Sequence, residues 1–236
     1  LLHMSLDDEP CDAPRWRVRR LFNRIKADID AGLRAFGHYR PEIDATLEFG
    51  DTCWHADITL RPGPRVRVRD VDVAINGEGA DDPAVSALLD ALPVAPGAPL
   101  MHADYESIKT GLQELALERG YLDAAFTVHE LRVYPDELAA DIRLHWNSGA
   151  RYRFGELRFA PQPLDEELLA RYSTIHPGDP YSTAALFDTT RALTDAGYFG
   201  SVQLLPRRAE AEGVEVPVDA ELSPLPRHGR RSHPSG

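Results

Sequence analysis

One order of motifs recurs along this chain, and this repetition restricts the possible folds more than any other feature. Its clearest copy predicts a helix that starts at a polar cap, either Ser182 or Thr183. Gly197 offers a left-handed stop to that helix, and Tyr198-Phe199 leads into the short apolar strand Val202–Leu205. The unit is a helix followed at once by a strand.

Earlier parts of the chain match this unit. The turn Pro96-Gly97-Ala98-Pro99 corresponds to Pro177-Gly178-Asp179-Pro180. The helix end Gly120-Tyr121 corresponds to Gly197-Tyr198, and Gly37 ends a helix in a first copy. The copies lie about 80 residues apart, which indicates a tandem array of small modules.

In the strands that open the second and third copies, the alternation of apolar residues switches from even to odd positions. Val66 and Val68 occupy even positions, whereas Val71 and Val73 occupy odd ones. A strand with period two cannot bury both sets on one face, so either a bulge lies near Asp70 or the chain passes there into another sheet. The second alternative suits a domain boundary. The same switch recurs at Glu156 in the third copy.

The remaining elements follow from apolar periodicity. Apolar residues at helical spacing mark one face of a long first helix: Val18, Phe22, Ile25, Ile29, Leu33 and Phe36. Alternation predicts a strand over Ile43–Phe49 and a returning strand over Trp54–Leu60. A short helix around Pro83–Leu92 and a second helix ending at Gly120 complete the middle copy.

These elements predict an α+β fold built from three β-α-α-β-β modules. In each module two helices cover one face of a three-stranded mixed sheet. We expect the modules at residues 1–64, 65–149 and 150–223, the first lacking its opening strand and most of its first helix. Residues 224–236 form a Pro-, Gly- and Ser-rich tail for which we expect no order.

Charge and hydropathy exclude several classes of function. A net charge of −12 argues against a nucleic-acid partner, and no apolar run is long enough to span a membrane. The histidines show no metal-ligand spacing, so we expect no enzyme, metal or cofactor. One helix carries a run of cations that we interpret as a solvated face, with a lipid-headgroup or anionic-partner patch as the alternative: Arg15, Arg17, Arg19, Arg20, Arg24 and Lys26.

The chain has two cysteines, Cys11 and Cys53. Their number and spacing fit neither a metal site nor a disulfide-rich scaffold. They can form a disulfide in an oxidising compartment or remain two unrelated buried thiols. The sequence leaves both alternatives open.

The module order, the Pro-Gly turn before the second helix and the Gly-Tyr-Phe after it resemble the POTRA (polypeptide-transport-associated) domain. Three modules in a row, together with the stretch Asn147–Gly155, are similar to the periplasmic part of the TamA family of outer-membrane proteins. The resemblance covers about residues 1–222. It implies a periplasmic location and a C-terminal β-barrel beginning after Leu222. The partners it implies are a TamB-like protein anchored in the inner membrane and unfolded outer-membrane β-barrel clients.

In a POTRA sheet the second strand lies at an edge, where its backbone can pair with a strand from another polypeptide. Here the edge strands would be Ile43–Phe49, Phe126–Val133 and Val202–Leu205. The residues we assign to partner binding are Ala45, Leu47, Phe49, Thr127, His129, Val202 and Leu204. The alternatives are a spacer or hinge that only positions a β-barrel, and a POTRA segment of a BamA-type or secretion-pore relative.

Overall fold

The computed structural model describes residues 9–162 and 164–224. The expected tail from 225 onward, and the first eight residues of the first predicted module, lie outside these ranges. The chain divides into two compact units. Unit 1 comprises Leu1–Ala74, Leu89–Gly111 and Phe126–His145, and unit 2 comprises Ile75–Leu88, Leu112–Ala125 and Trp146–Gly236.

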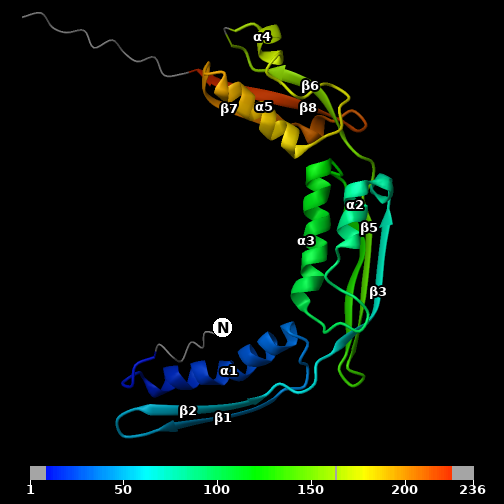
Figure 1. The fold of residues 1–236 in the computed structure, drawn as a ribbon. Coiled ribbons are helices and arrows are strands. Elements are labelled where there is room, and N and C mark those ends of the chain that lie inside the picture. Colours follow the sequence, from blue (N-terminus) through cyan, green and yellow to red (C-terminus); the bar gives the residue numbers. More distant parts are fainter. Residues whose placement is uncertain (1–8, 163, 225–236) are drawn as a thin grey trace, which may run out of the picture. The chain divides into compact units, whose positions relative to one another are not determined.

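Unit 1 begins with a helix packed on a hairpin. Helix α1 (Arg15–Ala35) lies against the antiparallel strands β1 (Glu42–Phe49) and β2 (Trp54–Arg61), as Figure 1 shows. Val18, Ile25 and Ile29 of α1 are buried against apolar side chains of both strands. The helix ends one residue before Phe36, which is 51% exposed, so the expectation that Phe36 lies on the buried face is wrong.

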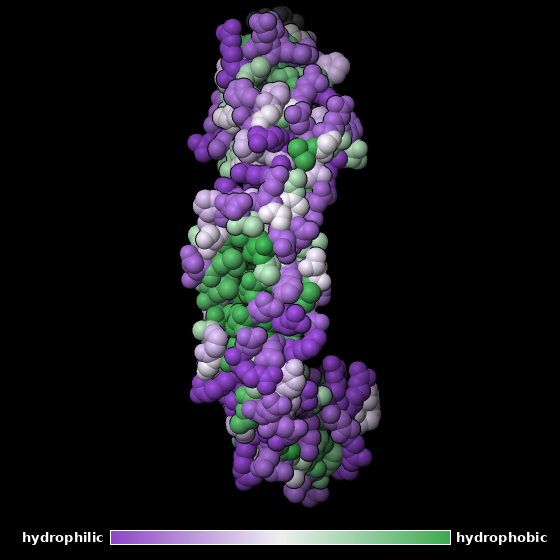
Figure 2. Space-filling model, turned by 90° about the vertical axis from the view of Figure 1, so that its right-hand side faces the viewer, coloured by the Kyte–Doolittle hydropathy of each residue, from purple (hydrophilic) through white to green (hydrophobic). Residues whose placement is uncertain are grey.

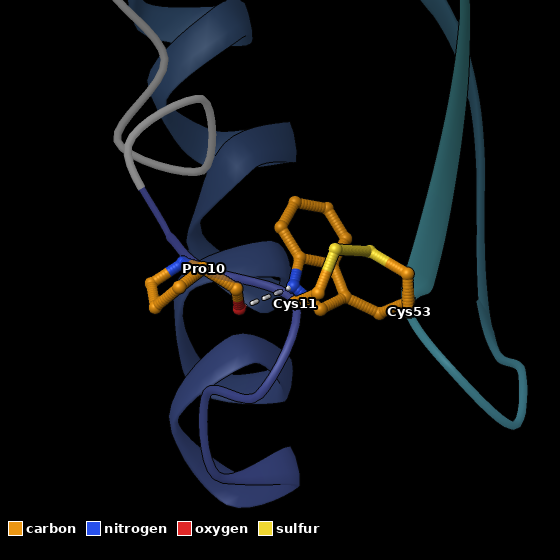
Figure 3. Close-up of a disulfide and its surroundings, with 4 residues drawn as sticks. Pro10, Cys11 and Cys53 are labelled. Atoms are coloured by element: carbon orange, nitrogen blue, oxygen red, sulfur yellow. Dashed lines mark hydrogen bonds between the residues drawn. A yellow bond between two sulfur atoms is a disulfide. The ribbon is translucent and has the colours of Figure 1, made fainter.

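A disulfide between Cys11 and Cys53 joins the segment before α1 to the turn of the hairpin (Figure 3). Beside it, the Trp54 indole Nε1 donates a hydrogen bond of 3.2 Å to the Pro10 carbonyl oxygen. Of the two alternatives left open by the sequence, the structure contains the disulfide. A link across 42 residues restricts the unfolded chain and so stabilises the small hairpin layer.

The middle sheet contributes to both units. Its strands are β3 (Arg67–Asn76), β4 (Ala125–Tyr134) and β5 (Ala139–Asn147), in the order β3-β5-β4. The helices between β3 and β4 are α2 (Pro83–Asp90) and α3 (His102–Arg119). A short 3-10 helix, η1 (Glu78–Asp81), lies between β3 and α2.

The third sheet belongs wholly to unit 2. Its strands are β6 (Arg153–Phe159), β7 (Phe199–Pro206) and β8 (Glu215–Pro224), in the order β6-β8-β7. Strand β6 is parallel to β8 and β7 is antiparallel to it. The helices are α4 (Glu166–Ala170) and α5 (Thr183–Asp195), and η2 (Arg208–Glu210) precedes β8. Of the two predicted cap residues, Ser182 is the one that caps α5, because its side chain accepts a hydrogen bond from the Ala185 N–H.

The α+β class and the mixed three-stranded sheets are confirmed. The phase change in β6 is a bulge, since the pairing with β8 shifts between Phe154 and Leu157 within one sheet. Strand β3 likewise continues through Asp70 as one strand. The alternative of a passage between sheets at these points is therefore wrong.

Two glycines end helices where another segment passes close by. Gly37 and Gly120 have φ of +84° and +82°. A Cβ on Gly37 would lie 2.6 Å from the Leu100 carbonyl oxygen, and one on Gly120 would lie 2.7 Å from Tyr181 Cβ. Only glycine fits both the backbone conformation and the available space. The Gly37 and Gly120 carbonyls each accept a bond of 2.8 Å, from the N–H groups of Val66 and Tyr152.

Candidate functional site

The strands predicted to lie at sheet edges do so. β4 and β7 are each an outer strand of a three-stranded sheet, and among the described strands β1 pairs with β2 alone. The assigned residues are distributed over three sheets and do not converge on one site. Each sheet also has a second outer strand that the sequence reasoning did not consider, namely β2, β3 and β6.

The Pro-Gly turns cover the beginnings of β3 and β6. Val68 N–H donates to the Ala98 carbonyl (2.8 Å), and Gly97 N–H donates to the Val68 carbonyl (2.7 Å). In the third sheet, Phe154 N–H donates to the Asp179 carbonyl (2.8 Å) and Gly178 N–H to the Phe154 carbonyl (2.7 Å). An arginine of each strand also reaches the glycine carbonyl of its turn, Arg67 Nη1 at 2.7 Å and Arg153 Nη1 at 2.8 Å. The repeated turns therefore close one edge of each sheet over its first residues.

Beyond Val68 the hydrogen bonds between this turn and β3 end. The half-buried Val71 and Val73 lie on that stretch of β3. Figure 2 shows a hydrophobic area at mid-height of the face that it presents. The sequence reasoning missed this partial edge. The predicted three-stranded sheet already implied it, because any such sheet has two outer strands.

On β7, the hydrogen-bond register determines which backbone groups face outward. Arg207 N–H bonds the Pro217 carbonyl, so Arg207 and Pro217 form a hydrogen-bonded pair. In an antiparallel ladder such pairs alternate, so Leu205, Gln203 and Ser201 bond to β8. The N–H and C=O groups of Val202 and Leu204 therefore point away from the sheet. Pro206, which has no N–H, occupies the next outward position, the kind of edge site that proline tolerates.

The β7 edge carries no charge. From Phe199 to Pro206 the strand contains no acidic or basic residue. Val202 and Leu204 direct their side chains into the core around Leu169 and Leu193, whereas Ser201 and Gln203 are exposed. An uncharged edge with two free pairs of backbone groups can accept another extended strand.

The β4 edge is different in character. Glu130 is half-buried, and its Oε2 lies 2.7 Å from Arg132 Nη2 on the same strand. An inward-directed charge is one of the devices that oppose pairing at an edge strand. Thr127 Oγ1 already donates to the His145 carbonyl at 3.2 Å, and the His129 ring lies edge-on to Phe126. Thr127 and His129 are thus engaged within their own sheet.

The β1 edge presents an intermediate case. Gly50 N–H bonds the Cys53 carbonyl, so alternation leaves the backbone groups of Ala45, Leu47 and Phe49 pointing outward. The Leu47 and Phe49 side chains pack in the core beneath α1. The solvent face of the strand carries three carboxylates, of which Glu42 bonds Arg61 at 3.2 Å: Glu42, Asp44 and Glu48.

The most buried charge that the structure describes is Asp82, in unit 2. It accepts hydrogen bonds from the Ala84 N–H (2.9 Å), from two nitrogens of Arg119 (3.0 and 2.9 Å) and from the Tyr121 hydroxyl (2.8 Å). Burial alone would raise the pKa of Asp82, but these donors outweigh it and the pKa lies below its ordinary value. Burial and the bond to Asp82 raise the pKa of Tyr121 to about 12.

The Asp82 cluster is structural, because both oxygens of the carboxylate accept hydrogen bonds from groups of the protein itself. Among the described residues no three His, Cys, Asp or Glu side chains are placed to hold a metal ion. Within the same ranges, no helix has the length and apolar character needed to cross a membrane.

The comparisons with known proteins agree with this architecture. Residues 1–62 match the family model described as POTRA domain, TamA domain 1. The chain is similar to POTRA3-5 of BamA from Haemophilus influenzae, with 18% sequence identity over 86% of this chain and 80% of that chain, and a TM-score of 0.50. It is also similar to BamA from Haemophilus ducreyi lacking POTRA domains 1-3, with 15% identity, a TM-score of 0.51, and coverage of 67% of this chain and 29% of that chain.

The chain therefore has the fold of POTRA domains. At this level of identity, the solved structures define the fold alone. The match to the TamA type rests on residues 1–62.

Proposed function

We propose that this chain is the periplasmic POTRA segment of an outer-membrane assembly factor of TamA type, and that it binds other polypeptides by β-strand addition at the edge of β7. Its partners would be unfolded β-barrel clients and a TamB-like protein. The observation that carries the proposal is the β7 edge, with outward backbone groups at Val202 and Leu204 and no charge along the strand.

Two further observations support it. The POTRA fold and the TamA-type match of residues 1–62 favour a role beside an outer-membrane protein. The disulfide between Cys11 and Cys53 fits an oxidising compartment such as the periplasm.

The energetics favour weak and sequence-tolerant binding. Two outward residues offer at most four backbone hydrogen bonds, a gain of about 2–6 kcal/mol at roughly 0.5–1.5 kcal/mol each. Association itself costs about 4–15 kcal/mol in lost freedom, so side chains of the added strand must contribute the difference. Such binding suits many extended clients better than one tight partner.

The test is a proline substitution on β7. Leu204→Pro removes an outward N–H while leaving the bonds from Gln203 and Leu205 to β8 in place. We expect the affinity for a peptide with an alternating outer-membrane strand sequence to fall about tenfold or more, measured by NMR titration of the full chain. Leu204→Val keeps the N–H and is the matched control, which should bind like the wild type.

A spacer that only positions a β-barrel predicts a different result. In that case no strand peptide shifts the β7 resonances, and Leu204→Pro and Leu204→Val behave alike. Equal binding by the two variants would contradict strand addition at this edge.

A further inference from the structure

The exposed face of α1 has a composition that the fold does not require. Trp16, Arg20 and Asn23 lie on the side of the helix opposite the buried Val18, Ile25 and Ile29. Together with the flanking Arg15, Arg19 and Arg24, they line an open hollow. Trp16 is 67% exposed. At 3.6 residues per turn, Trp16, Arg20 and Asn23 fall along one line at the centre of this face.

This arrangement opposes the stability of the helix. The N-terminal half of a helix has a positive electrostatic end, which favours acidic residues, yet the first turn of α1 has none. Six cations occupy residues 15–26 without a carboxylate between them. Like charges at this spacing repel one another, and exposing an indole to water forfeits the free energy of burying it.

Among the described residues, Glu9 is the one carboxylate that pairs with a cation of residues 15–26. Glu9 lies beside the patch and pairs with Arg17 at 2.8 Å, next to Trp16, Arg20 and Leu21. The Arg15 and Arg19 guanidinium groups lie over the Phe49 ring, at 5.2 and 5.8 Å from its centre. Within residues 9–162 and 164–224, no carboxylate lies within ion-pair distance of Arg15, Arg19, Arg20 or Arg24. The chain as a whole carries a net charge of −12, so this cationic face contrasts with the rest of the chain.

We infer that this face of α1 binds a lipid bilayer that carries anionic phosphate headgroups. Guanidinium groups donate paired hydrogen bonds to phosphate oxygens. An exposed tryptophan is stabilised at the headgroup level of a membrane, where its apolar ring leaves water while its N–H remains solvated. A cluster of cations on the exposed face of a helix is attracted to the anionic headgroups of such a surface.

Charge complementarity and Trp16 together select this occupant. Free phosphate would engage the arginines but leave the indole exposed. A lipid surface satisfies both groups at once, because phosphates and the interface occur at the same depth.

The test is co-flotation of the full chain with vesicles. We expect the chain to bind vesicles of phosphatidylcholine that contain about 30% of the anionic lipid phosphatidylglycerol. We expect no binding to vesicles of pure phosphatidylcholine. Arg20→Glu/Arg24→Glu should reduce the apparent affinity at least tenfold. The matched control Arg171→Glu/Arg191→Glu makes the same change in net charge at exposed arginines of unit 2 and should bind like the wild type.

A second readout keeps the test independent of protein folding. Addition of the anionic vesicles should shift the tryptophan fluorescence to the blue, and Trp16→Phe should abolish that shift, while Trp54 and Trp146 remain. The inference is overturned if both charge-reversal pairs lose binding equally, if inorganic phosphate produces the full fluorescence change, or if the chain binds polyglutamate but not the vesicles. The last outcome would assign the face to an acidic polypeptide.

Discussion

Strands β4 and β7 occupy the same place in their sheets but present different chemistry to a partner. Both are outer strands, and in both sheets the opposite outer strand is partly covered by a Pro-Gly turn. Only β4 carries charged residues, Glu130 and Arg132, on its own strand. The comparison shows that a repeated architecture fixes where edges lie, while a few side chains determine which edge remains free to pair.

The same contrast appears at the helix caps beside the middle sheet and the third sheet. Asp82 and Asp165 each precede a short helix and accept a bond of 2.9 Å from the backbone N–H two residues ahead. Asp82 is buried with Arg119 and Tyr121, whereas Asp165 is exposed and makes the cap bond alone. Asp82 therefore stabilises both the start of a helix and a buried network, whereas Asp165 stabilises the start of a helix alone.

The largest predicted effect distinguishes these two caps. Asp82→Ala should cost about 3 kcal/mol of unfolding free energy, because it leaves the Arg119 charge and the Tyr121 hydroxyl without a partner. Asp165→Ala should cost only about 1 kcal/mol, the usual value of an exposed cap. Amide hydrogen exchange of α2 and α4, the helices that follow the two caps, measures each loss locally. Equal losses at the two sites would show that the buried network adds nothing.

The next prediction concerns pH and Asp82. Its pKa in the folded protein is lowered from the ordinary 3.8, so the stabilisation is fully present above that value and is lost as the pH falls through the folded-state pKa. The difference in unfolding free energy between the wild type and Asp82→Asn should therefore be constant from about pH 5 to 8 and shrink below about pH 4. A difference that stays constant down to pH 2 would contradict the role of the charged carboxylate.

Much of this architecture could be predicted from the sequence. The matched turns, the glycine helix ends and the apolar alternation identified the ends of the helices and the edge strands, because each depends on local backbone preferences. The phase change near Asp70 and Glu156 was also visible. The sequence could not choose between a bulge and a change of sheet, since that depends on which strand lies beside β6.

What the sequence did not reveal depends on contacts between distant residues. Asp82 meets Arg119 and Tyr121 only after α2 and α3 have packed, and no spacing motif connects them. The pairing of the Pro-Gly turns with β3 and β6 likewise depends on segments that are distant in the sequence. Among the aromatic residues after the helices, Tyr121 and Phe199 are buried, whereas Tyr198 is 44% exposed.

The smallest predicted effect comes from adding a charge to the β7 edge and removing one from the β4 edge. Gln203 is exposed on β7, and Gln203→Lys should weaken binding of a strand peptide there several-fold, because a lysine guards an edge. Glu130→Thr removes the inward charge of β4 and should raise peptide binding at that edge by a similar factor. NMR titration of each variant separates the two edges. If neither substitution changes where the peptide binds, the charge pattern does not determine edge choice.

Amide hydrogen exchange along β7 tests the central claim most directly. In the free chain we expect the N–H groups of Val202 and Leu204 to exchange fast, and those of Ser201, Gln203 and Leu205 to be protected by β8. Saturation with a strand peptide should protect Val202 and Leu204 and leave the others unchanged. If Val202 and Leu204 remain unprotected while the peptide is bound, the partner does not add to this edge.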